Sequence, residues 1–154
     1  MTALWDWAVA AYGDEETARL CLELQDRHGQ QVCLLLWAGW AAGRGAVDED
    51  AVEAAVDIAR AWETATLAPL RAVRRTLKKP VPDMADEPRL AVRERLKGVE
   101  LAAERALLDA LAAEAPPTSG PATESVALMV RAARLWGETT PRSTLVSLAQ
   151  RLPA

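Results

Sequence analysis

The sequence contains no phenylalanine and only one tyrosine, and its β-branched residues are sparse and scattered. Because strands are usually rich in aromatic and β-branched side chains, little in this composition favours a sheet. The hydrophobic fraction of 51% rests mainly on alanine and leucine, which favour helix, together with six tryptophans. At 154 residues the chain is long enough to bury a core as one domain. We therefore predict an all-α fold.

Cysteine and histidine are also scarce. Cys21 and Cys33 lie within apolar helical segments, where we expect buried, reduced thiols. A metal site built from these cysteines and His28, the single histidine, would lack both a fourth ligand and a closely spaced cysteine pair. We therefore expect no metal and no cofactor. Residues 1–7 have neither a basic segment nor a cleavable hydrophobic stretch, so we expect a cytoplasmic protein.

Long hydrophobic runs are absent as well. The stretch from Val32 to Ala42 has no charge and no proline, but eleven helical residues rise only about 16 Å, roughly half of a bilayer core. We therefore expect no contact with a membrane. A helix that is apolar on every side has to be surrounded by protein on every side. The sequence thus predicts a compact helical bundle built around one central buried helix at about residues 31–43.

Glycine, proline and capping residues divide the rest of the chain into helices. Gly13 and Gly29 are suited to end helices, and Asp14 and Asp48 to begin them. Pro69 is expected to kink or break the helix that contains it. The predicted helices cover residues 2–12, 14–28, 32–42, 48–69, 70–79, 88–113, 123–136 and 142–152.

The segment 116–121, Pro-Pro-Thr-Ser-Gly-Pro, has the composition of a linker. It divides the chain into a helical bundle domain at 1–115 and a two-helix C-terminal appendage at 122–154. The narrow apolar stripes of the appendage have to be buried somewhere, either on a partner or on the protein's own core. The candidates for docking a partner are Met129, Trp136, Leu145 and Leu148.

A basic helix at residues 70–79 is the strongest candidate binding element. Its cations recur at intervals of three, one and three, which places them on one helical face. The opposite face is expected to dock on the core. The cations are Arg71, Arg74, Arg75 and Lys78, and the core-facing residues are Leu70, Val73 and Leu77. Such a basic face either binds a phosphate group, RNA or an acidic protein segment, or is simply solvated.

Glu100 and Glu104 lie one helical turn apart, between two stripes of leucine and valine. Carboxylates in such a position are partly buried and need partners. We predict that Glu100 or Glu104 meets Arg71, Arg74 or Arg75 across a contact between helices. The alternatives are a structural ion network, which we favour, and a catalytic or metal-binding pair.

Other polar positions have simpler explanations. Glu49, Glu53 and Asp57 share a helical face with Arg60, which predicts a solvated face neutralised by that arginine rather than a metal site. Gly39 in the central helix predicts a close approach between helices. Four residues are expected to fix the joint between the second and third helices: Gln25, Asp26, His28 and Gly29. No serine is paired with a base and no glycine-rich phosphate loop occurs, so we assign no catalytic residue.

Several segments together resemble a small proteobacterial family known as domain of unknown function 2390. The similarity covers roughly residues 4–108, and the family commonly has asparagine where this chain has Cys33. The resemblance supports a helical fold but implies no activity. It is carried by Trp5 and Tyr12, by Cys21–Asp26 running into Gly29, by Val32–Leu36 with Trp40, by Pro69–Arg71 with Arg74, Arg75, Leu77 and Lys78, and by Glu100, Leu101 and Ala103–Arg105.

Three classes of function remain open. We favour a non-enzymatic cytoplasmic adaptor or regulator that binds another protein of unknown identity. The first alternative is a phosphate-ligand or RNA-binding module using the basic helix, against which the net charge of −4 and the absence of a known binding motif argue. The second alternative is an enzyme, which a solvent-open cavity lined by Glu100, Glu104 and the basic residues would favour.

Overall fold

The computed structural model describes residues 3–115, 121–137 and 139–154, and these residues form helices and no strand. The helices are α1 (Leu4–Tyr12), α2 (Glu15–His28), α3 (Val32–Ala42), α4 (Glu49–Trp62), the π-helical turn η1 (Glu63–Leu67), α5 (Ala68–Thr76), α6 (Asp86–Ala112), α7 (Ser125–Trp136) and α8 (Arg142–Arg151). The predicted all-α class is confirmed. Among the described helices, none combines the length and the apolar character needed to cross a bilayer.

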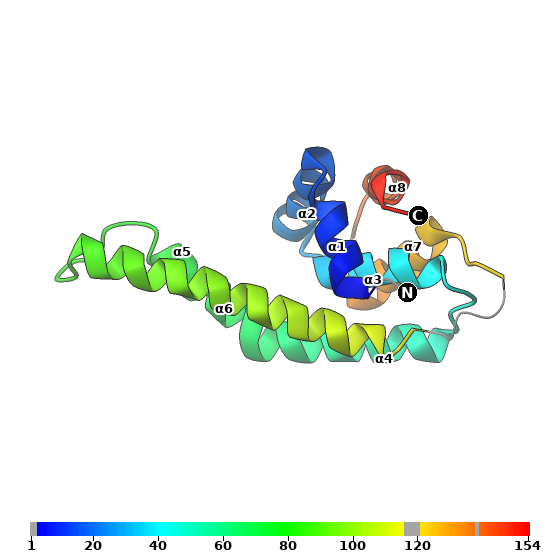
Figure 1. The fold of residues 1–154 in the computed structure, drawn as a ribbon, viewed down its shortest axis with the longest axis horizontal. Coiled ribbons are helices and arrows are strands. Elements are labelled where there is room, and N and C mark those ends of the chain that lie inside the picture. Colours follow the sequence, from blue (N-terminus) through cyan, green and yellow to red (C-terminus); the bar gives the residue numbers. More distant parts are fainter. Residues whose placement is uncertain (1–2, 116–120, 138) are drawn as a thin grey trace.

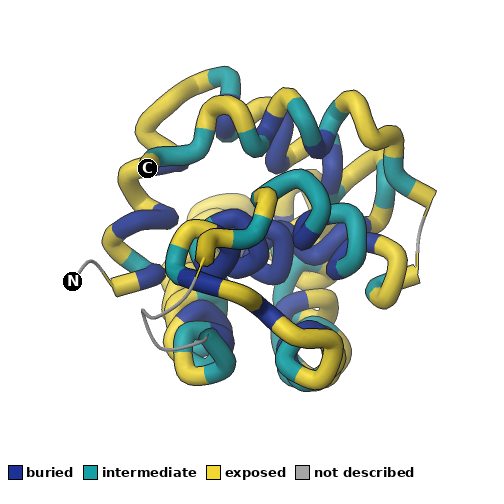
Figure 2. The backbone as a smooth tube through the Cα atoms, turned by 90° about the vertical axis from the view of Figure 1, so that its right-hand side faces the viewer, coloured by how far each residue is buried: buried dark blue, intermediate teal, exposed yellow. Residues whose placement is uncertain are grey.

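The centre of the fold is α3, as predicted. All of its residues are buried except Trp40, on which the Arg44 guanidinium stacks at 4.3 Å from the ring centroid. Helices α1, α2, α4, α6 and α7 each contact α3. Figure 2, viewed along the long axis, shows the buried segments gathered in the middle of the molecule. The apolar surface of α3 is therefore covered by helices from both halves of the chain.

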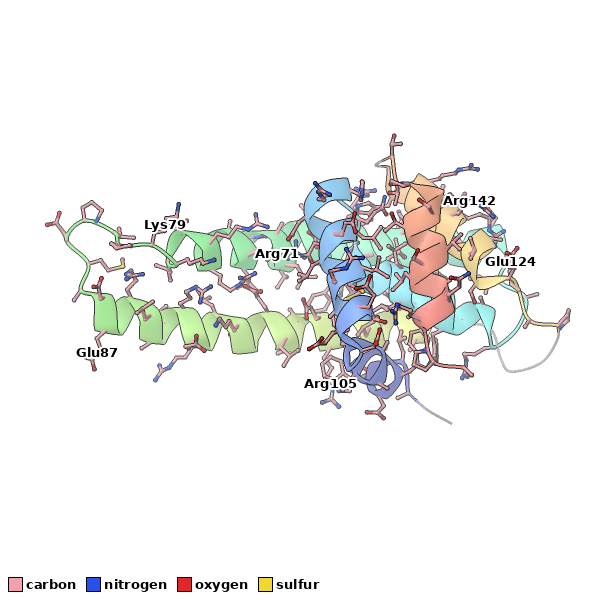
Figure 3. All side chains as sticks on the ribbon, turned by 90° about the horizontal axis from the view of Figure 1, so that it is seen from above. Arg71, Lys79, Glu87, Arg105, Glu124 and Arg142 are labelled. Atoms are coloured by element: carbon pink, nitrogen blue, oxygen red, sulfur yellow. The ribbon has the colours of Figure 1, made fainter. Side chains whose placement is uncertain are left out.

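A long helical hairpin underlies this bundle. One side of the hairpin is α4, η1 and α5 in succession, and the other is α6, which packs against all three. Figures 1 and 3 show that the hairpin extends well beyond the remaining helices, with Lys79 and Glu87 near its distant tip. We call the projecting part, residues 71–97, the arm.

The predicted kink or break at Pro69 takes a different form. The backbone stays helical through this region, but η1 widens to a π turn in which the Ala68 N–H donates to the Glu63 carbonyl, five residues earlier. A π turn adds one residue to the helix locally, and Pro69, which has no N–H to donate, falls in the first turn of α5, where prolines are tolerated. One continuous rod therefore replaces two separate helices.

The predicted helix ends are present. Asp14 accepts the Thr17 N–H at 2.9 Å and begins α2, and Asp48 accepts the Ala51 N–H at 2.8 Å and begins α4. Gly29 ends α2 in the left-handed conformation, with a φ of 60° that favours glycine. These local signals fix where the helices that surround α3 begin and end.

Helices α7 and α8 complete the core instead of leaving it. Met129, Leu145 and Leu148 are each at most 1% exposed, so they are buried within the chain and cannot dock a partner as considered from the sequence. Helix α7 packs on α3 and α4, and α8 packs on α2 and α7. The expected appendage thus shares the core of the bundle. Of the predicted linker 116–121, residues 116–120 lie outside the described residues.

Gly39 marks the close approach that the sequence predicts. A Cβ atom at this position would lie 2.5 Å from Leu152 Cδ1 and 3.1 Å from Met129 Cε. A side chain at residue 39 would therefore force the ends of these two side chains to shift. The C-terminal helices therefore pack directly against the middle of α3.

The burial of α8 predicts a large effect of truncating its core residue. Leu148→Ala is expected to lower the free energy of unfolding by about 2–5 kcal/mol, because it leaves a cavity against α2 and α7. Chemical denaturation followed by tryptophan fluorescence measures this. Leu135→Ala, at a position that is 39% exposed on α7, is the control and should cost less than about 1 kcal/mol. Equal, small losses for both variants would contradict the shared core.

Two arginines of α6 hold the arm together where little apolar surface is buried. Arg89 is 5% exposed, and its guanidinium donates to the Leu77 carbonyl at 2.5 Å and to Asp86 Oδ1 at 3.0 Å. Arg93 Nε donates to the Arg74 carbonyl at 3.4 Å. These donors satisfy carbonyls at the C-terminal end of α5, and a positive charge is favourable there.

Removing the guanidinium of Arg89 is expected to loosen the tip of the arm. Arg89→Met leaves the Leu77 carbonyl and the Asp86 carboxylate without this donor, which should speed amide hydrogen exchange in α5 and the first turns of α6 by about tenfold or more. Amides of α3 and α7 should keep their protection. Arg95→Met, at an exposed position on the same helix, should leave exchange unchanged throughout. A uniform loss of protection would instead mean that the arm and the bundle open together.

Candidate functional site

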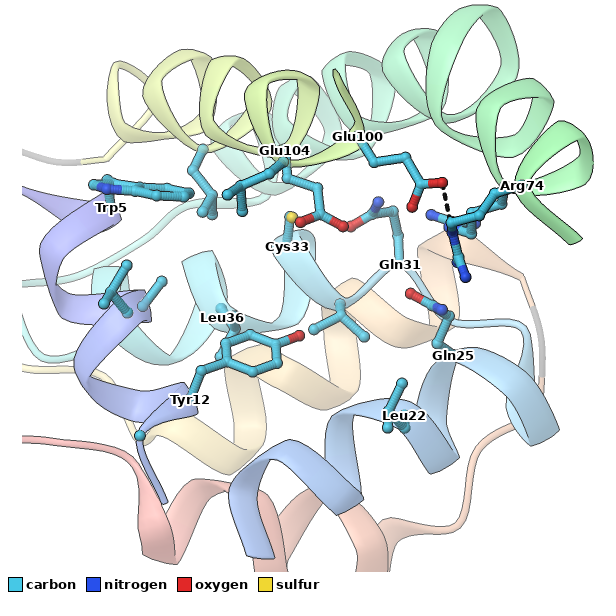
Figure 4. Close-up of a pocket in the computed structure, with 17 residues that line it drawn as sticks. Trp5, Tyr12, Leu22, Gln25, Gln31, Cys33, Leu36, Arg74, Glu100 and Glu104 are labelled. Carbon is cyan, nitrogen blue, oxygen red and sulfur yellow. Dashed lines mark hydrogen bonds and ion pairs between the residues drawn. The ribbon is translucent and has the colours of Figure 1, made fainter. Parts of the chain in front are cut away.

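A pocket of about 560 Å³, open to solvent, lies where the hairpin meets α1, α2 and α3. Figure 4 shows it with Trp5 at one end and Arg74 at the other. Its volume is within the range typical of sites for small ligands. The lining comprises Trp5, Ala8, Val9, Tyr12 and Gly13 from the first helix and its end, Leu22 and Gln25 from α2, Gln31, Val32, Cys33 and Leu36 around α3, and Arg71, Arg74, Glu100, Leu101, Glu104 and Leu108 from the hairpin.

Large apolar side chains surround the mouth of the pocket. Val9, Tyr12, Leu22 and Leu101 line it and are between 44% and 56% exposed. They come from three helices, so their exposure forms one continuous apolar rim rather than scattered surface residues. A rim of this kind is typical of a surface that receives another molecule.

Charged residues occupy the inner end of the same pocket. Arg74 Nε donates to Glu100 Oε1 at 2.7 Å, which confirms the predicted contact between the basic helix and this pair of carboxylates. Arg71 instead forms two hydrogen bonds with Glu63, at 2.6 and 3.0 Å. Among the described residues, Glu104 has neither a hydrogen bond nor an ion pair. The two arginines of the pocket are therefore each paired, and one carboxyl group is left over.

Burial raises the pKa of Glu104 above its ordinary value. The Arg71 guanidinium opposes this rise and the Glu100 carboxylate adds to it. Since the cost of taking the carboxylate out of water is the largest effect, the neutral acid is favoured relative to a solvated glutamate. The group is therefore sensitive to any charge that enters the pocket.

The thiol beside Glu104 is not poised for nucleophilic chemistry. Burial raises the pKa of Cys33, and it raises the pKa of Cys21 to about 11. Both cysteines are free and buried, as predicted. Because the thiolate is the reactive form, these thiols remain protonated at neutral pH and inert.

The basic helix lies partly outside the bundle. Arg75 and Lys78 are exposed, whereas Arg71 and Arg74 turn inward to their glutamates. Leu77 is buried, but Val73 is 47% exposed, so the expectation that it docks on the core is wrong. The reason is that the distal part of α5 projects past the bundle, where it packs against α6.

A second cleft continues from the first pocket toward the arm. Leu22, Gln25 and Arg74 line both. The second cleft is completed by Asp26 from α2 and by Arg75, Lys78 and Arg93 from the hairpin. A basic surface thus begins where the apolar pocket ends.

The arm differs in charge from the rest of the chain. Residues 71–97 include nine lysines and arginines and four aspartates and glutamates, a net charge of +5, so the remainder carries −9 of the total of −4. The arm also exposes aliphatic side chains to solvent: Val73, Met84, Leu90 and Val92 are between 44% and 51% exposed. Its surface therefore combines positive charge with unburied apolar area.

The joint between α2 and α3 is fixed by residues beyond those predicted. Gly29 ends α2 as expected, but the Asp26 side chain is exposed and accepts only a 3.4 Å hydrogen bond from Gln25. The buried Gln30 donates to Thr140 Oγ1 at 2.7 Å, and Gln31 caps α3 through the Leu34 N–H at 3.2 Å. His28 is half-buried at the end of α2. Two successive glutamines before an apolar run were the sequence signal for this joint.

Two further expectations from the sequence need correction. Arg60 does not neutralise the acidic face of α4, since its Nη2 donates to the Trp136 carbonyl at 2.7 Å and its guanidinium stacks on the Trp136 ring at 4.4 Å. Trp136 also donates from Nε1 to the Gly29 carbonyl at 2.8 Å, so its contacts are internal rather than with a partner.

Across the described ranges, no group of histidine, cysteine, aspartate or glutamate side chains is arranged to hold a metal ion.

The raised pKa of Glu104 predicts a specific dependence of stability on pH. In Glu104→Gln the group no longer titrates. As pH rises above the ordinary glutamate pKa, the unfolded wild-type chain ionises at this residue before the folded protein does. The wild type should therefore lose unfolding free energy relative to Glu104→Gln up to the raised pKa of the folded state, and the difference should then stay constant.

Denaturation curves between pH 4 and pH 8 measure this difference. Asp109→Asn, which alters an exposed carboxylate on the same helix, is the matched control and should show no comparable change. If the difference between wild type and Glu104→Gln were independent of pH, burial would not govern the ionisation of Glu104.

Comparison with known proteins identifies the family of the chain. The model of a family described as "Protein of unknown function (DUF2390)" matches residues 3–111. This range contains α1 to α5 and nearly all of α6, and with them the pocket and the arm. Neither a curated protein nor a solved structure matches the chain. The resemblance inferred from the sequence is therefore confirmed, and α7 and α8 lie beyond the matched residues.

Proposed function

The chain belongs to the DUF2390 family, and we propose that it is an interaction protein of the cytoplasm whose arm binds an acidic segment of another protein. The partner segment would carry carboxylates together with apolar side chains. This proposal keeps the favoured class from the sequence but moves the docking surface. Helices α7 and α8 are packed in the protein's own core, so we assign the docking surface to the arm instead.

The projection of the arm from the bundle is the observation that carries the proposal. A helical hairpin needs neighbours to bury its apolar side chains, and the outer part of this hairpin extends past the remaining helices. Arg75 and Val73 are exposed on α5, and Lys78 is exposed just beyond its end, so charge and apolar area lie close together along the chain. A complementary acidic and apolar segment would cover both.

The chemistry of the arm favours a protein partner over nucleic acid. The apolar side chains it exposes are aliphatic, and residues 71–97 contain no aromatic side chain on which a base could stack. Four acidic residues interrupt the positive charge of the arm, which weakens its attraction for a continuous phosphate backbone. Binding of a phosphate ligand or RNA is therefore the alternative that the experiment has to separate.

The enzyme alternative has one supporting observation. The pocket is open to solvent and lined by Glu100, Glu104 and two arginines, which is the lining named from the sequence for that class. Both arginines are paired with glutamates, however, and the thiols at and near the pocket are held protonated by burial. This chemistry supports a binding site better than a catalytic one.

Charge reversal on the exposed part of the arm tests the proposal. The probes are a helical peptide with glutamates on one face and leucines on the other, a polyglutamate peptide of equal charge, and a twelve-nucleotide RNA. We expect the glutamate–leucine peptide to bind most tightly and its affinity to fall with added salt. Arg75→Glu combined with Lys78→Glu should weaken it by about tenfold or more. Fluorescence anisotropy measures all three affinities.

A matched variant controls for net charge. Arg134→Glu combined with Arg142→Glu reverses two exposed arginines outside the arm and changes the total charge by the same amount. It should keep the peptide affinity within about twofold. Tighter binding of RNA than of either peptide would move the protein to the nucleic-acid class. Equal weakening by both double variants would mean that the arm has no specific role.

A further inference from the structure

We propose that the pocket between α1, α2, α3 and α6 is a second binding site, for a small organic cation, an amine that carries an apolar group. The ammonium would lie beside Glu104 and the apolar group would lie between Tyr12, Leu22 and Leu101. This site is separate from the exposed basic face of the arm and does not depend on the function proposed for it.

The shape of the pocket matches a ligand with two different ends. In Figure 4 the Glu104 carboxylate and the Tyr12 hydroxyl both point into the space, from opposite walls. Trp5 closes one end, and the Arg105 guanidinium stacks over the Trp5 ring at 5.2 Å and supports it from outside. Val9, Tyr12, Leu22 and Leu101 make up the rim. A ligand entering from solvent would thus meet apolar walls first and a carboxyl group further in.

The charges at the inner end of the pocket leave a surplus of one carboxyl group. Arg71 is bonded to Glu63 through both terminal nitrogens, and Arg74 is bonded to Glu100. These pairs are well ordered by burial, since the side chains of Arg71 and Glu100 are each 12% exposed. Glu104 is the remaining carboxyl group, and it has no partner among the described residues. A positive charge is what the site lacks.

An anionic ligand fits this arrangement poorly. Its charge would face Glu104 and Glu100, and the two arginines that might bind it already donate to glutamates. The exposed cations nearby, Arg75 and Lys78, line the neighbouring cleft and not the pocket. Binding an anion would require breaking a partly buried ion pair, which carries a large cost.

Glu104 has no evident role in holding the fold together. A partly buried carboxyl group without a partner costs stability, because it gives up contact with water and gains no hydrogen bond in return. Residues that lower stability in this way are typical of binding sites. The position of Glu104 in a solvent-open pocket, and not in the closed core, agrees with that interpretation.

The affinity for an amine should depend on pH because Glu104 titrates. The charged and titratable groups around it are Arg71 and Arg74 from α5, Glu63 from η1, Glu100 from α6, Cys33 from α3 and Tyr12 from α1. The thiol and the phenol stay neutral at neutral pH, because burial raises the pKa of each. Amine binding should therefore strengthen as pH rises and Glu104 ionises, and it should take up no proton.

Three ligands of equal chain length test the proposal: hexylammonium, 1-hexanol and hexanoate. Titrations of the full chain can be followed by tryptophan fluorescence, since Trp5 lines the pocket, and by calorimetry. We expect hexylammonium to bind about tenfold or more tightly than hexanol, and hexanoate to bind weakest. Glu104→Gln should remove the preference for the amine over the alcohol while it leaves alcohol binding in place.

Two controls keep the result interpretable. Asp109→Asn, on the exposed face of α6, should keep the full preference for the amine. Arg75→Glu combined with Lys78→Glu should also keep it, because these residues lie outside the pocket, so failure of the arm proposal would leave this test unaffected. Hexanoate binding as tightly as hexylammonium would overturn the proposal, as would an amine preference that survives in Glu104→Gln. Absence of binding by all three ligands would overturn it too.

Discussion

The need to cover α3 on every side is the constraint on which the rest of the structure depends. Because α3 has no polar face, none of its sides can face solvent favourably. Helices from the whole length of the chain therefore have to pack around it. α1, α2, α4 and α6 reach it from both sides of α3 in the sequence, and α7 returns from beyond residue 120 to cover it as well. The bundle is complete only when α8 closes over α2 and α7. Helices that leave this centre, such as the outer part of the hairpin, are the ones whose surfaces remain free.

The hairpin shows two ways of holding helices together in one molecule. Near α3 it is held by buried aliphatic side chains such as Leu107 and Leu111, which are fully buried. Away from α3 it is held by arginines of α6 that donate to carbonyls of α5, with little apolar burial. Hydrogen bonds from charged donors join the two helices of the arm without covering its aliphatic side chains, which stay exposed. The pocket lies at the boundary between the two regimes, which is why it has apolar walls and a charged inner end.

Much of the fold could be predicted from local signals. The run without charge at residues 32–42 predicts the central helix, and Asp14, Gly29 and Asp48 predict the helix ends, because these effects act within a few residues. The destination of α7 and α8 could not be predicted, since an amphipathic stripe indicates burial without naming the surface that buries it. The error at Val73 has the same cause: a helical wheel assigns an inner face whether or not a core lies beneath it.

In the site, the contact of Arg74 with Glu100 followed from complementary charge on adjacent helices. The pairing of Arg71 with Glu63 was missed because the π turn lies between them.

That π turn sets the angular relation between the two halves of the rod. The extra residue in η1 rotates everything after it by about 100° relative to an uninterrupted α-helix. With this rotation, Arg71 lies against Glu63 and Arg74 against Glu100, while Arg75 and Lys78 point to solvent. Without this rotation, a different pair of these four cations would face the pocket. The π turn therefore sets the helical face on which each later side chain lies. The chemistry of the pocket and of the arm depends on residue spacing as much as on residue type. A chain shortened by one residue in this turn would keep every side chain named here and still lose their arrangement.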